Sequence, residues 1–342
     1  MTALAAPDLP ARLAAFLAHA AGVPAAITAM QPIAGGASRE TWAVDAEIGG
    51  AHAALVLRMD LASSMNPDAL SRPQEFALLV AAHAGGVLAP CPRWLDADGA
   101  ALGRPFLLME RIPGESIGPR VMRRPELAAA RAHLPAQMAA QLARIHALDL
   151  AALKFLPRPP ANRSPALHAL DHTRRMIDAI DLQKPALELG LRWLAQRAPS
   201  CQQLTLVHGD FRVGNLLIGP DGLNAVIDWE FAHVGDPHED LAWPCVRDWR
   251  FGNTALHVGG VGALAPYLAA YESAASCTVD RNALRWWEIM GNLRWAATCH
   301  LQAHRHLSGA DPSVELVSLG RRAAEMELEF LTLIEETQEA QK

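Results

Sequence analysis

Two patterns of apolar residues divide the chain. Between Ile27 and Met109, short β-type apolar runs surround one helical segment, whereas beyond Pro113 apolar residues recur at helical spacing over long stretches. The run TWAVDAEIGGAHAALVLRMD has β-forming residues on both sides of Gly49 and Gly50, which predicts two strands joined by a tight turn. The later run PFLLME predicts a buried strand.

The segment SRPQEFALLVAAHAGG carries the start and stop signals of a helix. Ser71 precedes Gln74 by three residues, Pro73 falls in the first turn, and Gly85 and Gly86 follow the last apolar positions. We therefore predict one helix among the strands of the N-terminal part.

The C-terminal part is predicted to be mostly helical. Its long helical stretches are ELAAARAHLPAQMAAQLARIHAL, DRNALRWWEIMGNLRWAATCHLQAHRHL and SVELVSLGRRAAEMELEFLTLIEE. Between them, LTLV and NAVID are short β-type runs separated by a Pro-Asp-Gly turn, and we expect them to be adjacent strands of one hairpin. The predicted fold class is α+β, with a small antiparallel-sheet lobe over residues 1–112 and a larger helical lobe over residues 113–342.

Composition and charge limit the possible partners. The chain has 342 residues, of which 51% are hydrophobic, and a formal net charge of −6, which disfavours non-specific nucleic-acid binding. We therefore expect a small-molecule partner. Five scattered cysteines without a CxxC pair predict reduced thiols and a cytoplasmic location. Asp8 and Arg12 interrupt the apolar N-terminal segment, so we expect an amphipathic helix there rather than a signal peptide, and no run predicts a membrane span.

The stretch LVHGDFRVGNLLIGPDGLNAVIDWE concentrates the candidate chemistry. If its two β-type runs are adjacent, Asp210, Asn215 and Asp228 emerge at one end of the hairpin. Phosphoryl transfer needs a carboxylate that orients or deprotonates an attacking hydroxyl, which suits Asp210, and oxygen ligands for Mg²⁺, which suit Asn215 and Asp228. Alternatively, these side chains form turns and a helix cap.

This composite motif resembles that of a known family. The pattern HGDxxxxN ending at Asn215, followed by IDWE and then GDPHEDLA, is similar to the motifs of the aminoglycoside phosphotransferases, which are small-molecule relatives of the protein kinases. The resemblance covers nearly the whole chain and implies a protein-kinase-like bilobal fold with ATP and Mg²⁺ as cofactors. It also implies that Asp210 is the catalytic base, that Asn215 and Asp228 bind Mg²⁺, and that His208 supports the catalytic loop.

The resemblance also assigns nucleotide-binding roles in the N-terminal lobe. The segment IAGGASRETWAV stands in the place of the glycine-rich loop, although it is not GxGxxG. Arg58 replaces the lysine that holds the α- and β-phosphates, and Glu75 matches the glutamate that pairs with this cation. The junction between the lobes, at MERI, stands where the family binds adenine through backbone groups. The implied nucleotide-binding residues are Gly35, Gly36, Ala37, Ser38, Arg58, Glu75, Glu110 and Ile112.

Residues near the phosphate acceptor are open to two interpretations. Glu230 reaches the substrate or faces solvent. The late tryptophans line an apolar acceptor pocket or belong to the core; they are Trp243, Trp249, Trp286, Trp287 and Trp295, of which Trp286 and Trp287 are the substrate candidates. Asp236 and Asp240 are expected to cap the helix that starts near them.

The acceptor itself is expected to be a hydroxyl compound other than an aminoglycoside. Acidic residues form no dense late cluster that would suit a polycation. The phrases GGASRETW, VLR, GRPFLLMERIPGE and LRWA resemble kinase-like domains joined to acyl-CoA dehydrogenases, which implies a hydroxylated acyl acceptor.

Two rival functions remain open at this point. Arg58 and the altered glycine loop are compatible with a catalytically silent nucleotide sensor or scaffold. A metal-dependent phosphohydrolase would instead use His208, Asp210, Asp228 and His238 as ligands. The sequence leaves the acceptor, the choice between ATP and GTP, and the oligomeric state undetermined.

Overall fold

The computed structural model describes residues 9–33, 39–60, 69–180, 183–340. Its N-terminal part is a five-stranded antiparallel sheet with the strand order β1-β2-β3-β5-β4. The strands are β1 (Ala25–Pro32), β2 (Arg39–Ile48), β3 (Ala51–Asp60), β4 (Pro92–Asp96) and β5 (Phe106–Glu110). The hairpin predicted around Gly49 and Gly50 is confirmed as β2 and β3, which pair from Ile48 with Ala51 outward.

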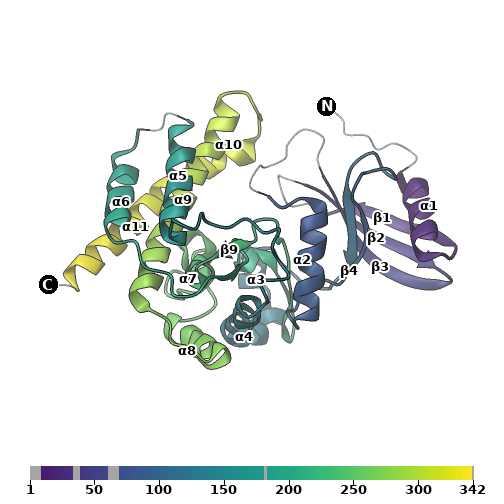
Figure 1. The fold of residues 1–342 in the computed structure, drawn as a ribbon, viewed down its shortest axis with the longest axis horizontal. Helices are drawn as coiled ribbons and strands as arrows, with labels where there is room; N and C mark the ends of the chain where they lie inside the picture. Colours follow the sequence, from purple (N-terminus) through teal and green to yellow (C-terminus); the bar gives the residue numbers. More distant parts are fainter. Residues whose placement is uncertain (1–8, 34–38, 61–68, 181–182, 341–342) are drawn as a thin grey trace.

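Two helices lie on opposite sides of this sheet (Figure 1). Helix α1 (Leu9–Ala21) forms a cluster with Phe106 and Leu108, whereas helix α2 (Arg72–Ala84) belongs to the cluster that contains Leu107 and Met109. Successive side chains of β5 thus point to opposite faces, and both faces are covered, which explains why PFLLME is apolar without alternation.

The predicted start of α2 is also confirmed. Ser71 and Gln74 form the reciprocal capping box, and Gly85 ends the helix. The N-terminal helix has the predicted amphipathic character, because Leu13 and Leu17 are fully buried while its other face is exposed. Within the part of the chain that the structure describes, no helix is both long and apolar enough to cross a membrane.

Helices dominate the C-terminal part, as predicted. They are α3 (Gly118–Arg123), α4 (Ala128–His146), α5 (Pro165–Asp178), α6 (Pro185–Gln196), α7 (Pro237–Ala242), α8 (Leu264–Ala275), α9 (Arg281–Leu307), α10 (Val314–Gly320) and α11 (Ala323–Glu339). The stretch SVELVSLGRRAAEMELEFLTLIEE forms two helices, because α10 ends at Gly320 before α11 begins. Both of them pack on α9, the long central helix of this part (Figure 1).

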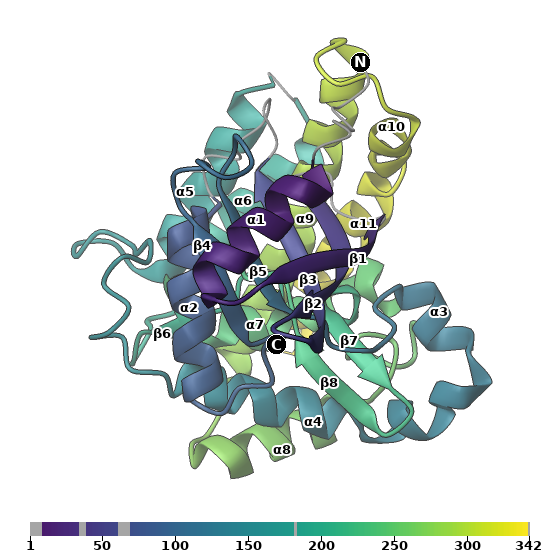
Figure 2. The ribbon, with the colours of Figure 1, turned by 90° about the vertical axis from the view of Figure 1, so that its right-hand side faces the viewer.

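The expected pairing of LTLV with NAVID is wrong. Strand β6 (Thr205–Val207) pairs with the later strand β9 (His233–Gly235), and β8 (Gly222–Val226) pairs with β7 (Leu216–Gly219). The run LLIG, directly after Asn215, is itself a strand that folds back through the turn onto β8, so the local partner displaces the more distant one. The β7-β8 hairpin lies beside α4 (Figure 2).

Candidate active site

Asp210 lies on the loop that follows β6, and its carboxylate accepts hydrogen bonds from three described side chains. The Asn215 amide donates to Oδ2 of Asp210 at 2.6 Å and to its backbone carbonyl at 2.9 Å. Oδ1 accepts the Arg212 Nε–H at 3.0 Å and the Trp243 indole N–H at 2.6 Å. The Asp210 side chain keeps 15% exposure, so solvent or a ligand can reach it.

These bonds distinguish the two oxygens of Asp210. A carboxylate oxygen has two lone-pair positions, and Oδ1 uses both for Arg212 and Trp243. Among the described residues, only the Asn215 side chain donates to Oδ2, which leaves one lone-pair position there for another donor. A hydroxyl that approaches this carboxylate therefore finds its acceptor at Oδ2.

Asp228 follows β8 and joins a second set of charges. Its Oδ1 accepts from Arg58 at 2.8 Å, and the same guanidinium donates to Glu75 Oε1 at 2.8 Å. Arg58 and Glu75 are buried, with 9% and no exposure, so Glu75 is not an exposed carboxylate on the surface of α2. The pair of cation and glutamate implied by the family resemblance is therefore present.

The same contacts set the protonation of this cluster. Burial alone lowers the pKa of the Arg58 guanidinium, but Glu75 and Asp228 more than offset it, so the pKa is raised. Burial raises the pKa of the Asp228 carboxyl, but Arg58 and, to a smaller extent, His208 and Arg212 outweigh burial, so the pKa lies below its ordinary value. Arg58 and Asp228 are thus a fully charged pair at neutral pH.

Backbone geometry brings the loops of Asn215 and Asp228 together. The Ile227 N–H donates to the Asn215 carbonyl at 2.9 Å. Asp228 then turns sharply, with a φ of 66°, a left-handed conformation that aspartate tolerates better than most residues. The three residues predicted to meet at one hairpin end do converge, although two separate small sheets deliver them.

His208 is a buried positioning residue of both loops. It is fully buried, its Nδ1 accepts the Asp210 backbone N–H at 3.3 Å, and its Nε2 lies 3.1 Å from the Ile227 carbonyl. These partners fix the tautomer that carries the proton on Nε2, and burial lowers the pKa of the imidazole, which keeps it neutral. The loop-supporting role implied for His208 agrees with these contacts.

Asp240 holds the loop rather than capping the helix. It is fully buried, and its two oxygens accept the His208 N–H at 2.6 Å and the Gly209 N–H at 3.0 Å, while His146 Nε2 lies 3.3 Å away. The cap of α7 is Asp236, as expected, whose side chain accepts from His238 N–H. The prediction that Asp240 caps the helix is therefore wrong, because its backbone partners His208 and Gly209 lie 32 and 31 residues earlier in the chain.

The structure decides between the two interpretations of Glu230, Trp286 and Trp287. Glu230 is buried, with 4% exposure, so the solvent-facing alternative is wrong. Trp286 and Trp287 are 2% and 3% exposed, pack ring against ring at 5.0 Å, and belong to the core. Trp286 donates to the Leu194 carbonyl, so its polar atom is used inside the protein. The core interpretation holds for this pair in place of the acceptor pocket.

Two other tryptophans of the same late group, Trp243 and Trp249, lie beside Asp210. Trp243 bonds Asp210 directly, and its ring contacts that of Trp249 at 5.7 Å. Trp249 in turn lies under the Arg212 guanidinium, 4.5 Å from carbon to ring centre. Trp243 follows Asp210 by 33 residues, so no local spacing signals this contact.

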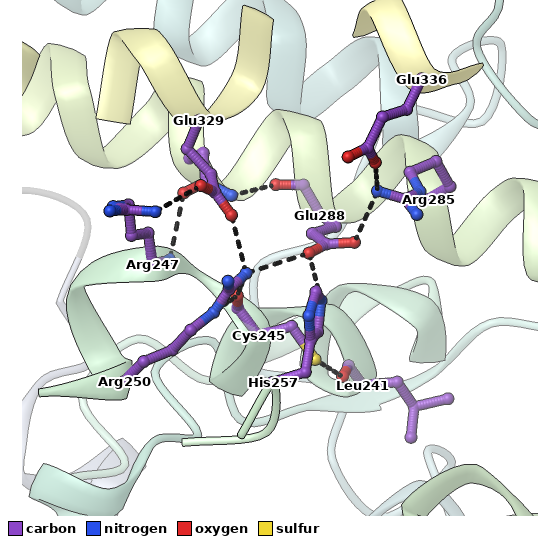
Figure 3. Close-up of polar contacts among 10 residues, drawn as sticks. Leu241, Cys245, Arg247, Arg250, His257, Arg285, Glu288, Glu329 and Glu336 are labelled. Carbon is purple, nitrogen blue, oxygen red and sulfur yellow. Dashed lines mark hydrogen bonds and ion pairs between the residues drawn. The ribbon is translucent and has the colours of Figure 1, made fainter. Parts of the chain in front are cut away.

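A buried ionic network anchors the segment that carries these two rings (Figure 3). Arg250 donates to the Cys245 carbonyl at 2.7 Å and pairs with Glu329 at 2.9 Å and Glu288 at 3.4 Å. His257 Nε2 also contacts Glu288 at 2.5 Å. Because Glu288 is on α9 and Glu329 is on α11, the network fixes residues 243–257 to the helical core.

The nucleotide-loop residues Gly35, Gly36, Ala37 and Ser38 lie outside the described residues. Glu110 ends β5, where its backbone N–H donates to Cys91 and its side chain pairs with Arg93 at 2.8 Å. Ile112 follows at the start of the connection into the C-terminal part. The assignment of Glu110 and Ile112 to adenine stays a prediction.

The residues at Asp228 fit a magnesium nucleotide. The side-chain nitrogen of Asn215 donates to Asp210, which leaves the side-chain oxygen Oδ1 of Asn215 for another partner. Asp228 Oδ2 accepts no hydrogen bond from a described residue. Neutral and carboxylate oxygens are the hard ligands that Mg²⁺ prefers, with places left for phosphate oxygens. Asn215 and Asp228 would hold the ion.

The ligand set of the phosphohydrolase alternative does not assemble. His238 bonds Asp236 at 2.6 Å, and His208 Nε2 is occupied by the Ile227 carbonyl. Over the described ranges, no three His, Cys, Asp or Glu side chains form a group that could hold a metal ion.

Comparisons with known proteins identify the family of the chain. The family model described as Phosphotransferase enzyme family (APH) matches residues 29–287. Acyl-CoA dehydrogenase family member 10 of Mus musculus is 32% identical over 207 residues, which cover 56% of this chain and 18% of the mouse protein. Family member 11 of Gallus gallus is 27% identical over 226 residues, covering 64% of this chain and 28% of the chicken protein. The chain therefore spans less than a third of these relatives.

Solved structures confirm the fold class. A candidate aminoglycoside phosphotransferase from Ralstonia eutropha JMP134 superposes with a TM-score of 0.75 at 20% identity, over 95% of this chain and 98% of the other. Spectinomycin phosphotransferase, in complex with ADP and spectinomycin, superposes with a TM-score of 0.61 at 13% identity, over 94% and 98%. The fold is the predicted α+β, protein-kinase-like bilobal fold, and both resemblances drawn from the sequence are confirmed. The chain belongs to the phosphotransferase enzyme family.

Proposed function

We propose that this chain is an ATP-dependent kinase that transfers the γ-phosphate to a hydroxyl group of a small molecule. The observation that carries the proposal is the convergence of Asp210, Asn215 and Asp228 on one site, with Arg58 and Glu75 paired beside it. Phosphoryl transfer requires little of a protein beyond positioning and charge stabilisation, and this set supplies both.

Each residue has a role that its contacts define. Asp210 accepts the proton of the acceptor hydroxyl at Oδ2, since Oδ1 is saturated by Arg212 and Trp243. Asn215 and Asp228 hold Mg²⁺, which when bound neutralises charge on the phosphates. Arg58, fixed by Glu75 and Asp228, supplies the cation for the nucleotide phosphates in place of lysine.

The partners follow from the same proposal. Structures of phosphotransferases with this fold contain ADP or GDP, which supports a purine nucleotide as phosphate donor. The relatives named for acyl-CoA dehydrogenases favour a hydroxylated acyl compound as acceptor over an aminoglycoside. The net charge of −6 favours a small molecule over nucleic acid, and five free cysteines favour the cytoplasm.

A nucleotide sensor of the same fold is the second candidate. The Arg58 guanidinium occupies one oxygen of Asp228, so the metal ligand is already engaged in an ion pair. A sensor would bind ATP without turnover. The complete set of Asp210, Asn215 and Asp228 favours the kinase, because binding alone has no need of a base.

Mg²⁺-dependent release of ADP from ATP tests the proposal. The wild type is compared with Asp210→Ala and Asp228→Ala across hydroxy-acyl compounds, amino alcohols, sugars and aminoglycosides. Asp210→Ala is expected to lower turnover by about 10²- to 10⁴-fold and to keep nucleotide binding. Asp228→Ala is expected to remove the Mg²⁺-dependent part of nucleotide affinity. Turnover that survives Asp210→Ala would refute the mechanism, and ATP binding without any acceptor-dependent release would support the sensor.

A further inference from the structure

The Arg212 guanidinium is held in place by contacts that use little of its hydrogen-bonding capacity. Its Nε–H donates to Asp210 at 3.0 Å, and its plane lies over the ring of Trp249. The guanidinium also packs against Gly214, where a larger residue would not fit, since a Cβ at that position would lie 2.1 Å from Nη1 of Arg212. The side chain keeps 25% exposure.

The two terminal nitrogens of Arg212 have no partner among the described residues. A guanidinium has five N–H donors, and here one is used. Two other arginines of the C-terminal part, by contrast, are engaged at their terminal nitrogens: Arg294 pairs with Glu239 at 2.7 Å, and Arg250 pairs with two glutamates (Figure 3). Arg212 is thus a fixed cation beside the base with its Nη1 and Nη2 groups unpaired.

We propose that Arg212 is a specificity-determining residue that binds a carboxylate on the acceptor, so that the acceptor is a hydroxy acid and not a polycation. The inference rests on the proposed function, because it places the carboxylate on the molecule whose hydroxyl meets Asp210. The Nη1 and Nη2 groups match a carboxylate in the bidentate arrangement. The stack on Trp249 and the bond to Asp210 fix the plane of the guanidinium before the ligand arrives, which lowers the entropic cost of binding.

The position of Arg212 also lets it bind the carboxylate of the acceptor without blocking the oxygen of Asp210 that accepts the proton. Nε occupies Oδ1 of Asp210, whereas the proton of the hydroxyl is accepted at Oδ2. A substrate that spans both groups has its hydroxyl at Oδ2 and its carboxylate at the nitrogens on the far side of the same guanidinium. The acceptor therefore carries its carboxylate a few bonds away from its hydroxyl.

Calorimetric binding and turnover with matched acceptors test this assignment. The panel pairs short- and medium-chain hydroxy acids with the corresponding hydroxy amides, which differ only in charge. The variants are Arg212→Gln, Arg212→Lys and Gly214→Ala, the last of which displaces the guanidinium without removing it. The matched control is Arg197→Gln, because Arg197 also stacks on an indole, that of Trp193 at 4.8 Å, but is exposed at the end of α6.

The inference predicts a charge-dependent effect. Wild type and Arg197→Gln bind hydroxy acids about 10- to 100-fold more tightly than the amides, since a hydrogen bond to a charged group has that magnitude. Arg212→Gln removes the difference, Arg212→Lys keeps part of it, and Gly214→Ala reduces it. Wild-type binding that does not distinguish acid from amide overturns the inference. An equal loss of affinity for acid and amide in Arg212→Gln also overturns it, and would assign Arg212 to the transferring phosphoryl group instead. If acid and amide are distinguished by binding but no ADP is released, the proposed kinase activity fails while the carboxylate site stands.

Discussion

Replacing Asp240 by asparagine would test how the catalytic loop is held. Asp240 is fully buried, and its two oxygens accept the backbone N–H groups of His208 and Gly209 separately. Asparagine has nearly the same shape but only one oxygen. One of the two N–H groups would then face an amide NH₂, so a donor would oppose a donor inside the protein.

The expected loss of stability follows from these bonds. A hydrogen bond to a charged group contributes about 1.5–3 kcal/mol, and an unsatisfied buried N–H adds to the cost, so Asp240→Asn should lower the free energy of unfolding by about 2–4 kcal/mol. With an unfolding entropy of about 2.1 cal/mol/K per residue, this corresponds to a fall in Tm of about 3–6 °C for the chain. Turnover should fall as well, because the displaced loop carries Asp210.

Asp236→Asn is the matched control. Asp236 is also buried and lies four residues before Asp240, but the two donors that His238 supplies, its backbone N–H and Nδ1, both act on the single oxygen Oδ1. Asparagine supplies such an oxygen and is an equally good N-cap, so the loss should stay below about 1 kcal/mol. Thermal unfolding and urea titration of both variants would measure the difference. If Asp240→Asn were no less stable than Asp236→Asn, the assigned role of Asp240 would be refuted.

Three further predictions concern neighbouring contacts. Trp243→Phe removes the indole N–H from Asp210 and should lower kcat by about 10- to 100-fold with little change in the KM for ATP; an unchanged kcat would contradict the role. Burial raises the pKa of Glu239, but His233 and Arg294 outweigh it, so the pKa is about 2 against an ordinary 4.5 and the charged form stabilises the fold above pH 4.5. Urea titrations should show that the wild type loses about 3 kcal/mol more than Glu239→Gln as pH falls from 5 to 2; equal losses would contradict this role of Glu239. Arg58→Met leaves buried carboxylates without their cation and should lower the free energy of unfolding by about 3–5 kcal/mol, whereas Arg58→Lys should lower it less. Equal losses would show that the charge of Arg58 does not cause the stabilisation.

Sequence patterns predicted the local elements where the signal is local. The β2-β3 hairpin follows from its glycine pair, and α2 follows from a capping box within four residues. The predicted partner of β6 is wrong for two reasons. Its true partner, β9, begins 26 residues after β6 ends, and the run LLIG, which forms β7, pairs with NAVID in place of β6. Short apolar runs carry no label for their partner, so tertiary context decides the pairing.

The site divides in the same way. Asp210, Asn215 and Asp228 stand on a compact motif, and their convergence is visible from the sequence. The contacts of Trp243 and Asp240 are not, because an indole or a carboxylate 30 or more residues away gives no periodic signal. Helical spacing could not separate Trp243, which bonds Asp210, from Trp286 and Trp287, which belong to the core, since burial accounts for that spacing without any ligand.

The arrangement around Asp210 links the choice of acceptor to the rate of reaction. The groups that bond its Oδ1 are Arg212, which we propose binds the acceptor, and Trp243, and both contact Trp249. A substitution that reshapes this part of the site for a new acceptor therefore also alters the hydrogen bonds of Asp210, the proposed base. Residues on the proposed nucleotide side, such as Arg58 and its carboxylates, are bonded to one another instead. Changes of acceptor should consequently appear in kcat as well as in KM, whereas changes on the nucleotide side should act mainly through nucleotide affinity and stability.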